Sequence, residues 1–214
     1  MLQVVCQAQY LTRNVGSMRS TDYDATHMVK AVKGLDLSPN AYTYVTIQGK
    51  SHKITNESKD DAISWFAEWA VFQIGGLGAG PNIILLPIPS SKTVVTSPED
   101  YRTCRIANAI ASLLPKSLVS SALRFKTPLP NSREEGGSRD PHVLYPNMVL
   151  ANVPPGDIVL IDDVMTSGGH FTAANWILAD QGRTPVLAVA CGRSLETQVD
   201  NPFAGWAEEL PTGR

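Results

Sequence analysis

Two adjacent acids, Asp162 and Asp163, stand shortly before a turn of hydroxyl-bearing and glycine residues at 166–169. Carboxylates at such a point can accept hydrogen bonds from sugar hydroxyls or bind a metal ion. A glycine turn that opens a helix presents free backbone N–H groups and the positive end of a helix dipole, which together favour a phosphate. Because the acids repel that anion, the segment predicts a phosphate at the turn and a hydroxyl-rich group or a metal at the acids.

The elements on both sides of these residues must bring them to one edge of a sheet. Residues 157–161 form an apolar run, which is typical of a strand covered on both faces. Residues 169–181 predict a helix that Gly182 closes. In open parallel sheets, ligands bind at the carboxyl ends of the strands. The acids and the turn therefore stand where such a sheet would bind a ligand.

Strand and helix patterns alternate through the second two-thirds of the chain. Further strands are predicted at 82–86, 117–124 and 185–191. A helix is predicted over 97–114, because it opens with Ser-Pro-Glu-Asp, a capping residue followed by proline and two acids. This alternation predicts an α/β fold, a parallel sheet with helices on both faces.

The first third of the chain predicts a small antiparallel N-terminal subdomain. Residues 41–48 and 51–55 have the pattern of a β-hairpin, and residues 2–10 alternate as a half-buried strand does. Residues 58–74 predict a helix with apolar residues on more than one face, which indicates burial or the subunit contact of a homodimer. The predicted domain organisation is a subdomain at 1–80, a core at 81–192 and a C-terminal tail at 193–214.

Residues 157–173, DIVLIDDVMTSGGHFTA, resemble the phosphoribosyl diphosphate motif of type I phosphoribosyltransferases. That motif is an apolar strand, two acids, two apolar residues and then Thr-(Thr/Ser)-Gly-Gly-Thr. The resemblance implies a type I phosphoribosyltransferase-like core over about residues 81–192. It also implies that Asp162 and Asp163 are the catalytic and metal-binding acids, which face the ribose 2- and 3-hydroxyls. The substrate-binding residues that it implies here are Val164, Met165, Thr166, Ser167, Gly168, Gly169 and His170, the last at a position where the family usually has Thr or Ser.

The resemblance implies two further parts of the site. Type I members bind pyrophosphate on a loop after an early core strand, and Ser90, Ser91 and Lys92 follow the strand at 82–86. A mobile loop in the family closes over the diphosphate, which makes residues 126–147 a candidate lid. Its cations are Lys126, Arg133 and Arg139. Without the resemblance, the first segment is an ordinary Pro/Ser turn and the second a solvated charged loop.

The helix predicted over 97–114 carries two arginines near its start. Residues 101–114 faintly resemble the Arg-rich helix of competence-associated phosphoribosyltransferase homologues. We interpret Arg102 and Arg105 instead as solvated helix charges, since a charged run on a helix is usually its solvent face.

The implied activity is that of a pentosyl glycosyltransferase of nucleotide metabolism. A 5-phosphoribosyl group passes from phosphoribosyl diphosphate to a nitrogen nucleophile such as a nucleobase, and pyrophosphate leaves with Mg²⁺ as cofactor. In the family a hood recognises the base, and residues 1–80, the candidate hood, resemble no known hood, so the acceptor stays open. Two alternatives remain: a non-catalytic regulator that senses phosphoribosyl diphosphate, and a structural interaction protein with a decayed site.

Composition narrows the classes of partner. The 214 residues carry a formal net charge of −2, so no basic excess favours a nucleic-acid partner. No apolar run reaches the roughly 18 residues of a membrane span, and residues 1–13 lack the features of a signal peptide. The three cysteines are far apart and predict reduced core thiols. These features predict a soluble, cytoplasmic protein.

Overall fold

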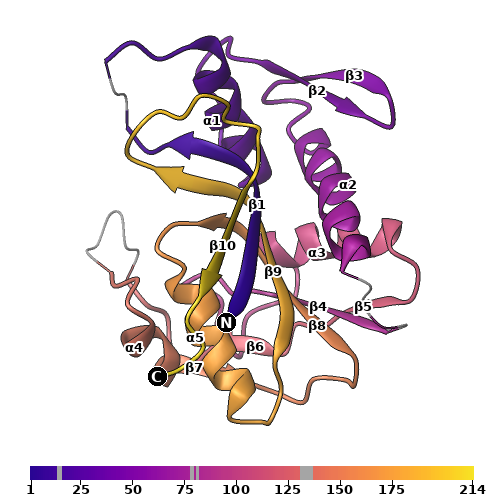
Figure 1. Cartoon of the computed structure of the whole chain (residues 1–214), viewed down its shortest axis with the longest axis vertical. Helices are drawn as coiled ribbons and strands as arrows, with labels where there is room; N and C mark the ends of the chain where they lie inside the picture. The colour runs from indigo at the N-terminus through magenta and orange to yellow at the C-terminus, as the bar shows by residue number, and fades with distance from the viewer. Residues whose placement is uncertain (14–15, 78–79, 81, 131–136) are drawn as a thin grey trace.

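The protein, described here from a computed structural model, is built on a six-stranded sheet (Figure 1). The structure describes residues 1–13, 16–77, 80, 82–130 and 137–214. The strand order is β10-β1-β9-β8-β4-β5. The bounds are β1 Leu2–Leu11, β4 Ile83–Pro87, β5 Ser117–Val119, β8 Asp157–Met165, β9 Pro185–Leu195 and β10 Trp206–Leu210.

The strand that carries the two acids lies inside this sheet. β8 pairs in parallel with β4 on one side and with β9 on the other. β5 and β1 extend the parallel arrangement, and β10 alone is antiparallel to its neighbour. Alternate residues of β8 face opposite sides of the sheet, with Val159 and Ile161 in one core and Ile158 and Leu160 in the other. The predicted parallel sheet, covered on both faces, is confirmed.

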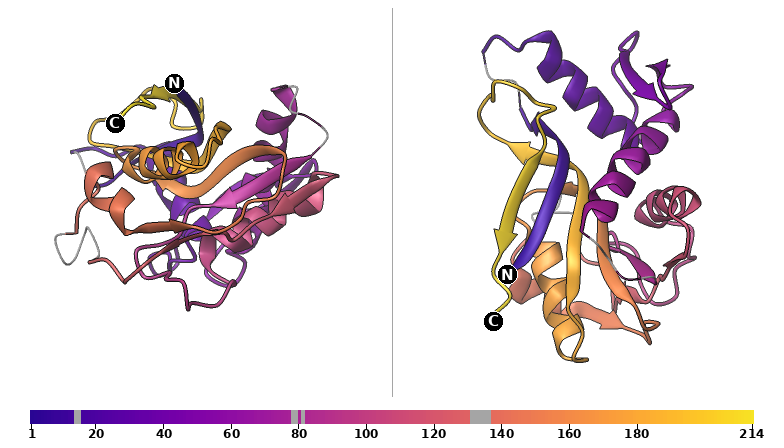
Figure 2. Two further views of the ribbon diagram at one scale, coloured as in Figure 1. Left: turned by 90° about the horizontal axis from the view of Figure 1, so that it is seen from below. Right: turned by 45° about the vertical axis from the view of Figure 1, so that its right-hand side comes forward.

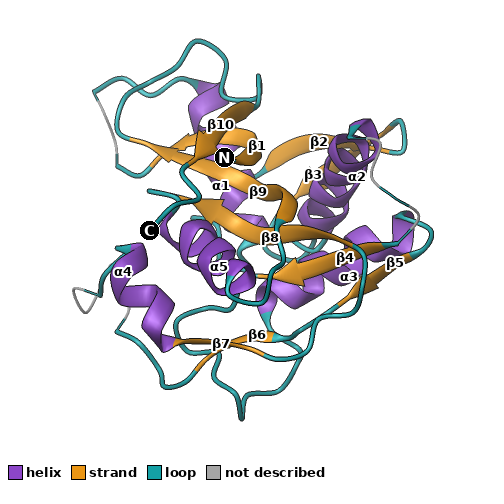
Figure 3. Cartoon of the chain, turned by 60° about the horizontal axis from the view of Figure 1, so that its bottom comes forward, coloured by secondary structure: helices purple, strands orange, loops and turns teal. Residues whose placement is uncertain are grey.

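Helices cover the two faces separately. α1 (Ser20–Val32), α2 (Asp61–Gly76) and α3 (Arg102–Leu113) pack into the core that includes Val159 and Ile161. α5 (Gly169–Ala179) packs into the other core beside α4 (Pro141–Leu144) and the two short strands β6 (Leu123–Phe125) and β7 (Met148–Leu150). A 3₁₀ turn, Tyr145–Asn147, joins α4 to β7. Figure 3 shows α5 beside α4, and the right-hand view of Figure 2 shows α1 toward the opposite end of the molecule from α5.

The expected hairpin is present in the first third of the chain. β2 (Thr43–Ile47) and β3 (Lys50–Ile54) pair antiparallel, with partners from Thr43↔Ile54 to Ile47↔Lys50. The two residues between them, Gln48 and Gly49, both have positive φ, which matches the right-handed twist of the flanking strands. The hairpin packs against α2, so it forms a layer with the first two helices.

The prediction that residues 2–10 form a half-buried strand is wrong. β1 is a strand, but almost all of it is buried. Nine of the ten residues of β1 are buried, because β9 and β10 flank it and both of its faces are covered. Its polar residue Gln9 is accommodated by a hydrogen bond from Nε2 to the carbonyl oxygen of Gly205. β1 and β10 lie outside residues 81–192 and still join the main sheet. The sheet therefore depends on both ends of the chain.

The start of α3 also differs from the expectation. The helix begins at Arg102 rather than at Ser97. The Ser97 hydroxyl accepts a hydrogen bond from the backbone N–H of Val94, three residues earlier. Ser97 therefore closes a turn in the segment after β4 and does not cap α3. The hydroxyl of Thr103 donates to the carbonyl oxygen of Ile88, which fixes the first turn of α3 to the end of β4.

Candidate active site

A cleft of about 450 Å³ opens at the carboxyl ends of β4 and β8. It collects residues from six separate stretches of the sequence. The polar residues of its wall are Lys33, Ser90, Ser91, Lys92, Arg102, Ser138, Arg139, Asp162, Asp163, Thr166 and His170. The wall thus has four Lys or Arg side chains against two carboxylates, in a chain whose formal net charge is −2. This excess of positive charge favours an anionic ligand.

The two acids occupy positions next to each other near the end of β8. Asp163 is 5% exposed and forms an ion pair with the guanidinium of Arg102 at the start of α3. Its backbone N–H donates to Oδ1 of Asp162 at 2.7 Å. Burial, together with the neighbouring charge of Asp163, raises the pKa of Asp162 well above its usual range. One acid is therefore paired with a cation, and the other holds its proton more tightly than a solvated aspartate does.

The pairing of Arg102 corrects the sequence interpretation. Arg102 is not a solvated helix charge, because it lines the cleft and contacts Asp163. Arg105, by contrast, is exposed, and its ion pair with the exposed Asp100 is long, at 3.7 Å. The position of each arginine in α3 separates Arg102 from Arg105. Arg102 is in the first turn, which follows the loop after β4 and lies at the carboxyl edge of the sheet, whereas Arg105 is one turn farther along.

The turn after β8 is held by residues from distant parts of the chain. Gly168 has a φ of 78° and caps α5 in the left-handed region that favours glycine. A Cβ at Gly168 would lie 2.8 Å from the side chain of Leu210, and a Cβ at Gly169 would lie 1.8 Å from the carbonyl oxygen of Arg139. The guanidinium of Arg193 donates to the carbonyl oxygen of Thr166. Gly168 is thus required by its positive φ and Gly169 by the close approach of a backbone carbonyl, and contacts with distant residues hold the turn in place.

His170 opens α5 beside the acids. Burial lowers its pKa to about 4, and the nearby charge of Asp163 opposes this shift only in part. Its ring meets that of Phe125 edge to face, with the centroids 6.3 Å apart. At neutral pH His170 is therefore an uncharged ring that can donate one hydrogen bond into the cleft.

The loop after β4 is more open. Ser90 and Lys92 are exposed, and all of Ser90, Ser91 and Lys92 line the cleft. The Ser90 hydroxyl lies 2.8 Å from that of Thr93. The backbone of Ser91 accepts a hydrogen bond from Leu129, which ties this loop to the segment that precedes α4.

Not every residue predicted for the site faces the cleft. Val164 lines it, whereas Met165 is 1% exposed and lies in the core beneath. Ser167, Gly168 and Gly169 form the turn without lining the cavity. Among the candidate lid residues, Arg139 lines the cleft, Lys126 donates to the carbonyl oxygen of Pro146, and Arg133 lies outside the described residues.

Sequence reasoning missed Lys33 and Leu35, which the first 80 residues contribute to the cleft. They follow the end of α1 and carry no motif. Only the packing of α1 against β1, β8 and β9 brings them to the carboxyl ends of β4 and β8.

The acids fit a magnesium ion that arrives with a diphosphate better than one that the protein holds alone. Within the described ranges, no group of three or more His, Cys, Asp or Glu side chains is placed to hold a metal ion. Mg²⁺ commonly takes one or two carboxylates, several waters and the oxygens of substrate phosphates. Of the two acids, Asp162 is the one that forms no ion pair with the Lys and Arg side chains that the structure describes, so it is the residue that would contact such an ion.

Comparison with solved structures gives matches at the level of the fold. The chain resembles the crystal structure of adenine phosphoribosyltransferase from Trypanosoma brucei in complex with AMP, pyrophosphate and ribose-5-phosphate. The match has a TM-score of 0.41 and 12% identity, and it covers 89% of this chain and 87% of the other. No family model and no curated protein sequence matches the chain. At this level the likeness concerns the path of the chain, and the site stands on its own residues.

Among the described residues, no helix has the length and apolar character needed to cross a bilayer.

Proposed function

We propose that the chain is a phosphoribosyltransferase that binds phosphoribosyl diphosphate in the cleft at the ends of β4 and β8. The observation that supports this most is the gathering of two acids and four cations around one cavity, with the glycine turn between the lining residues Thr166 and His170. A ligand with a phosphate, a sugar diol and a diphosphate uses each of these groups. The turn at 166–169 would take the 5-phosphate, Asp162 and Asp163 the ribose hydroxyls, and the segment Ser90 to Lys92 the pyrophosphate.

In the proposed reaction a nitrogen nucleophile forms a bond to the anomeric carbon as the bond from that carbon to pyrophosphate breaks. The nucleophile loses its proton, and pyrophosphate leaves with Mg²⁺. The transition state carries positive charge on the ribose ring, so a nearby carboxylate stabilises it more than it stabilises the ground state. Lys92 and Arg139 would neutralise charge on the leaving group, and the rest of the site would act by positioning.

One observation favours the second candidate, a regulator that binds phosphoribosyl diphosphate without turnover. Asp163 is paired with Arg102, and burial raises the pKa of Asp162, so both acids are less available as free carboxylates than solvated aspartates are. A catalytic role requires that ligand binding, with its magnesium ion, favours the ionised form of Asp162. A sensor has no such requirement.

The test is titration calorimetry with phosphoribosyl diphosphate and Mg²⁺, followed by assay of pyrophosphate release over a panel of nitrogen nucleophiles. We expect binding, and release with at least one acceptor. Asp162→Asn should then lower kcat and kcat/KM together by roughly thirty- to a thousand-fold, about 2–4 kcal/mol of transition-state stabilisation. Binding without release on every acceptor supports the regulator, and no binding refutes both candidates.

A further inference from the structure

A second cavity, of about 530 Å³, lies beside the cleft on the flank of α1. The end of β1, one side of α1 and the segment that follows α1 form its wall. The two cavities share Lys33 and Leu35, so they meet at the carboxyl end of α1. The residues that line only the second cavity are Tyr10, Leu11, Thr12, Arg13, Met18, Tyr23, Thr26, His27, Val29, Lys30, Ser38 and Ala41.

The charge of the second cavity is of one sign. Arg13, Lys30 and Lys33 line it, and no Asp or Glu does. Arg13 approaches Glu196 at 3.6 Å, but both side chains are largely exposed, so that pair is weak. Lys30 has no ion pair within the part of the chain that the structure describes. Cations grouped without a lining acid favour an anion in the same space.

The wall also suits a flat ring. Tyr10, Tyr23 and His27 contribute aromatic surface, and the rings of Tyr23 and His27 are 6.3 Å apart. Met18 and Leu35 add apolar contact, and a wall of aromatic and apolar side chains with a few polar groups is typical of small-molecule sites. An aromatic ligand with one anionic substituent therefore matches both properties of the wall.

His27 supplies a polar group that has no partner. Its Nδ1 atom is buried and makes no hydrogen bond. Burial, and then the charge of Lys30, lower the pKa of His27, while Asp24 and a hydrogen bond with the backbone of Tyr42 act in the opposite direction. If the other ring nitrogen makes that backbone bond as a donor, Nδ1 of the neutral ring is an acceptor. Because this atom is itself covered, a ring N–H of a ligand reaches it only when the side chains over it move aside.

We infer that this second cavity is the acceptor site, and that the acceptor is an aromatic nitrogen compound bearing a carboxylate. The inference rests on the proposed phosphoribosyl transfer, since it gives that reaction its second substrate. Lys30 and Arg13 bind the carboxylate, the side chains of Tyr23 and Leu35 contact the ring, and Nδ1 of His27 accepts from a ring N–H. Lys33 lies at the boundary, where the acceptor and the phosphoribosyl group would meet.

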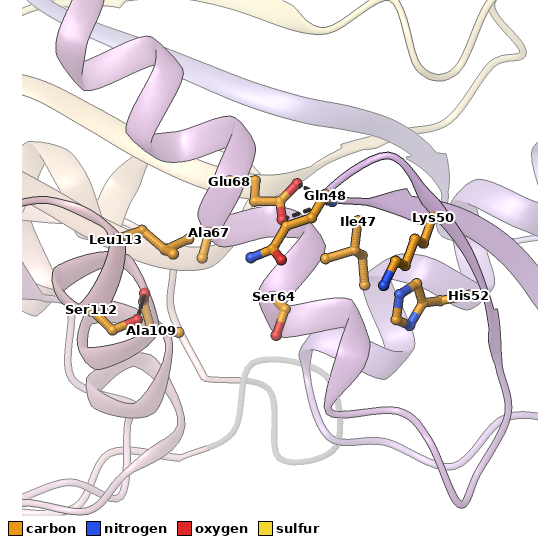
Figure 4. A pocket seen from close by; sticks show the side chains of 10 residues that line it. All are labelled: Ile47, Gln48, Lys50, His52, Ser64, Ala67, Glu68, Ala109, Ser112 and Leu113. Atoms are coloured by element: carbon orange, nitrogen blue, oxygen red, sulfur yellow. Dashed lines mark hydrogen bonds between the residues drawn. The ribbon is translucent and has the colours of Figure 1, made fainter.

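A third cavity, between the hairpin and helices α2 and α3, offers a useful contrast (Figure 4). Its one acid, Glu68, already accepts two hydrogen bonds from the backbone N–H of Gln48, so it closes the hairpin turn. Lys50 lines this cavity and is exposed. Because this cavity shares no lining residue with the other two, Lys50 is a matched control for the loss of one positive charge.

The experiment compares aromatic carboxylates with their uncharged counterparts on the full chain. The probes are orotate against uracil, and nicotinate against nicotinamide, titrated with and without phosphoribosyl diphosphate and Mg²⁺. We expect each carboxylate to bind at least tenfold more tightly than its counterpart. Lys30→Gln should weaken carboxylate binding about fivefold or more and leave the affinity for phosphoribosyl diphosphate unchanged. Lys50→Gln should change neither. Equal binding of charged and uncharged probes, or equal behaviour of the two lysine variants, overturns the inference.

His27→Phe tests the hydrogen bond separately, since it keeps a ring and removes the acceptor atom. We expect it to weaken orotate, which has ring N–H groups, and to leave benzoate, which has none, within about twofold. Equal weakening of both would reduce His27 to a packing residue and overturn its assigned role. A melting curve for each variant verifies that it is folded.

Failure of this inference and failure of the proposed function are distinguishable. If phosphoribosyl diphosphate binds but no carboxylate is preferred, the acceptor inference fails alone. If the carboxylates bind as expected but phosphoribosyl diphosphate does not, the second cavity is a carboxylate site and the transferase proposal fails. If neither binds, both are wrong.

Discussion

The two loops at the floor of the cleft follow neighbouring parallel strands, yet they are held in different ways. The loop after β8 is enclosed by Leu210 and by the backbone of Arg139, and Arg193 binds the carbonyl oxygen of Thr166. The loop after β4 leaves Ser90 and Lys92 exposed. The first loop is part of the packed structure, and the second is a solvated rim.

This difference separates two ways of binding an anion. A backbone turn provides its N–H groups without reorganisation only if other elements fix its geometry, as in the loop after β8. A lysine and two serines on an open loop bind through side chains that must be ordered when the ligand arrives, which costs side-chain entropy. Substitutions in the loop after β8 should therefore affect stability and binding together, whereas those in the loop after β4 should affect binding alone.

The largest expected effect is that of Gly169→Ala. Alanine in place of a helical glycine normally stabilises a helix by about 0.5–1 kcal/mol. Here the new Cβ would lie 1.8 Å from the carbonyl oxygen of Arg139, so the backbone must move. We expect a loss of about 2–4 kcal/mol in the free energy of unfolding, since overpacking against backbone usually costs 1–3 kcal/mol or more. Denaturant unfolding measures it.

Gly75→Ala is the matched control. Gly75 also lies in a helix, α2, and nothing is within 4 Å of its Cβ position. This substitution should raise stability by the usual 0.5–1 kcal/mol, so the two variants should differ in sign. If Gly169→Ala proves as harmless as Gly75→Ala, the loop after β8 is not enclosed, and the contrast between the two loops is lost.

An intermediate effect is expected for Asp162→Asn in the absence of ligand. Burial raises the pKa of Asp162, so the folded chain binds its proton more tightly than the unfolded chain does. The stability from this proton is present below the unfolded pKa and is lost as pH rises through the raised, folded pKa. Asparagine carries no charge at any pH. It should therefore melt higher than the wild type at pH 8, by roughly 2–4 °C, equivalent to about 1 kcal/mol in a chain of this size.

The comparison of melting curves at pH 8 and pH 4 checks this sign. The advantage of the asparagine variant should shrink toward pH 4, where the wild-type carboxyl is protonated as well. A variant that melts several degrees lower than the wild type at both pH values would make Asp162 a structural residue instead, and would remove it from the proposed ribose site.

The parts of the cleft that could be predicted from the sequence are those fixed by local residue pattern and by their position at the edge of the sheet. The apolar run of β8, the glycine turn and the helix after it were read correctly, because each depends on local preferences and on a parallel sheet that binds ligands at its carboxyl edge. The hairpin was read correctly for the same local reason.

What the sequence did not reveal depends on contacts between distant segments. Leu210 lies in a segment read as a tail, yet it packs on Gly168. Arg102 resembles any other helix charge until α3 is placed over the end of β8. Lys33 reaches the cleft only because α1 packs against β1, β8 and β9. No local pattern marks such residues, since a side chain gains its role from the element that packs against it.

The smallest effect on stability is expected for Lys92→Gln, which tests the loop after β4. Lys92 is exposed and has no ion pair within the described residues, so its loss should change the free energy of unfolding by no more than about 0.5 kcal/mol. Its side chain lines the cleft, and the loss of one positive charge should weaken the binding of inorganic pyrophosphate with Mg²⁺ by about three- to tenfold. Because the loop is solvated, salt should screen the contact, so the difference in pyrophosphate affinity between wild type and variant should narrow as ionic strength rises.

Lys50→Gln, outside the cleft, provides the baseline for both measurements. A variant that loses stability as well as affinity would mean that the loop after β4 is packed like the loop after β8. Unchanged affinity would take Lys92 out of the anion site and leave Lys33, Arg102 and Arg139 as the cations of the wall, which the same titration can test in turn.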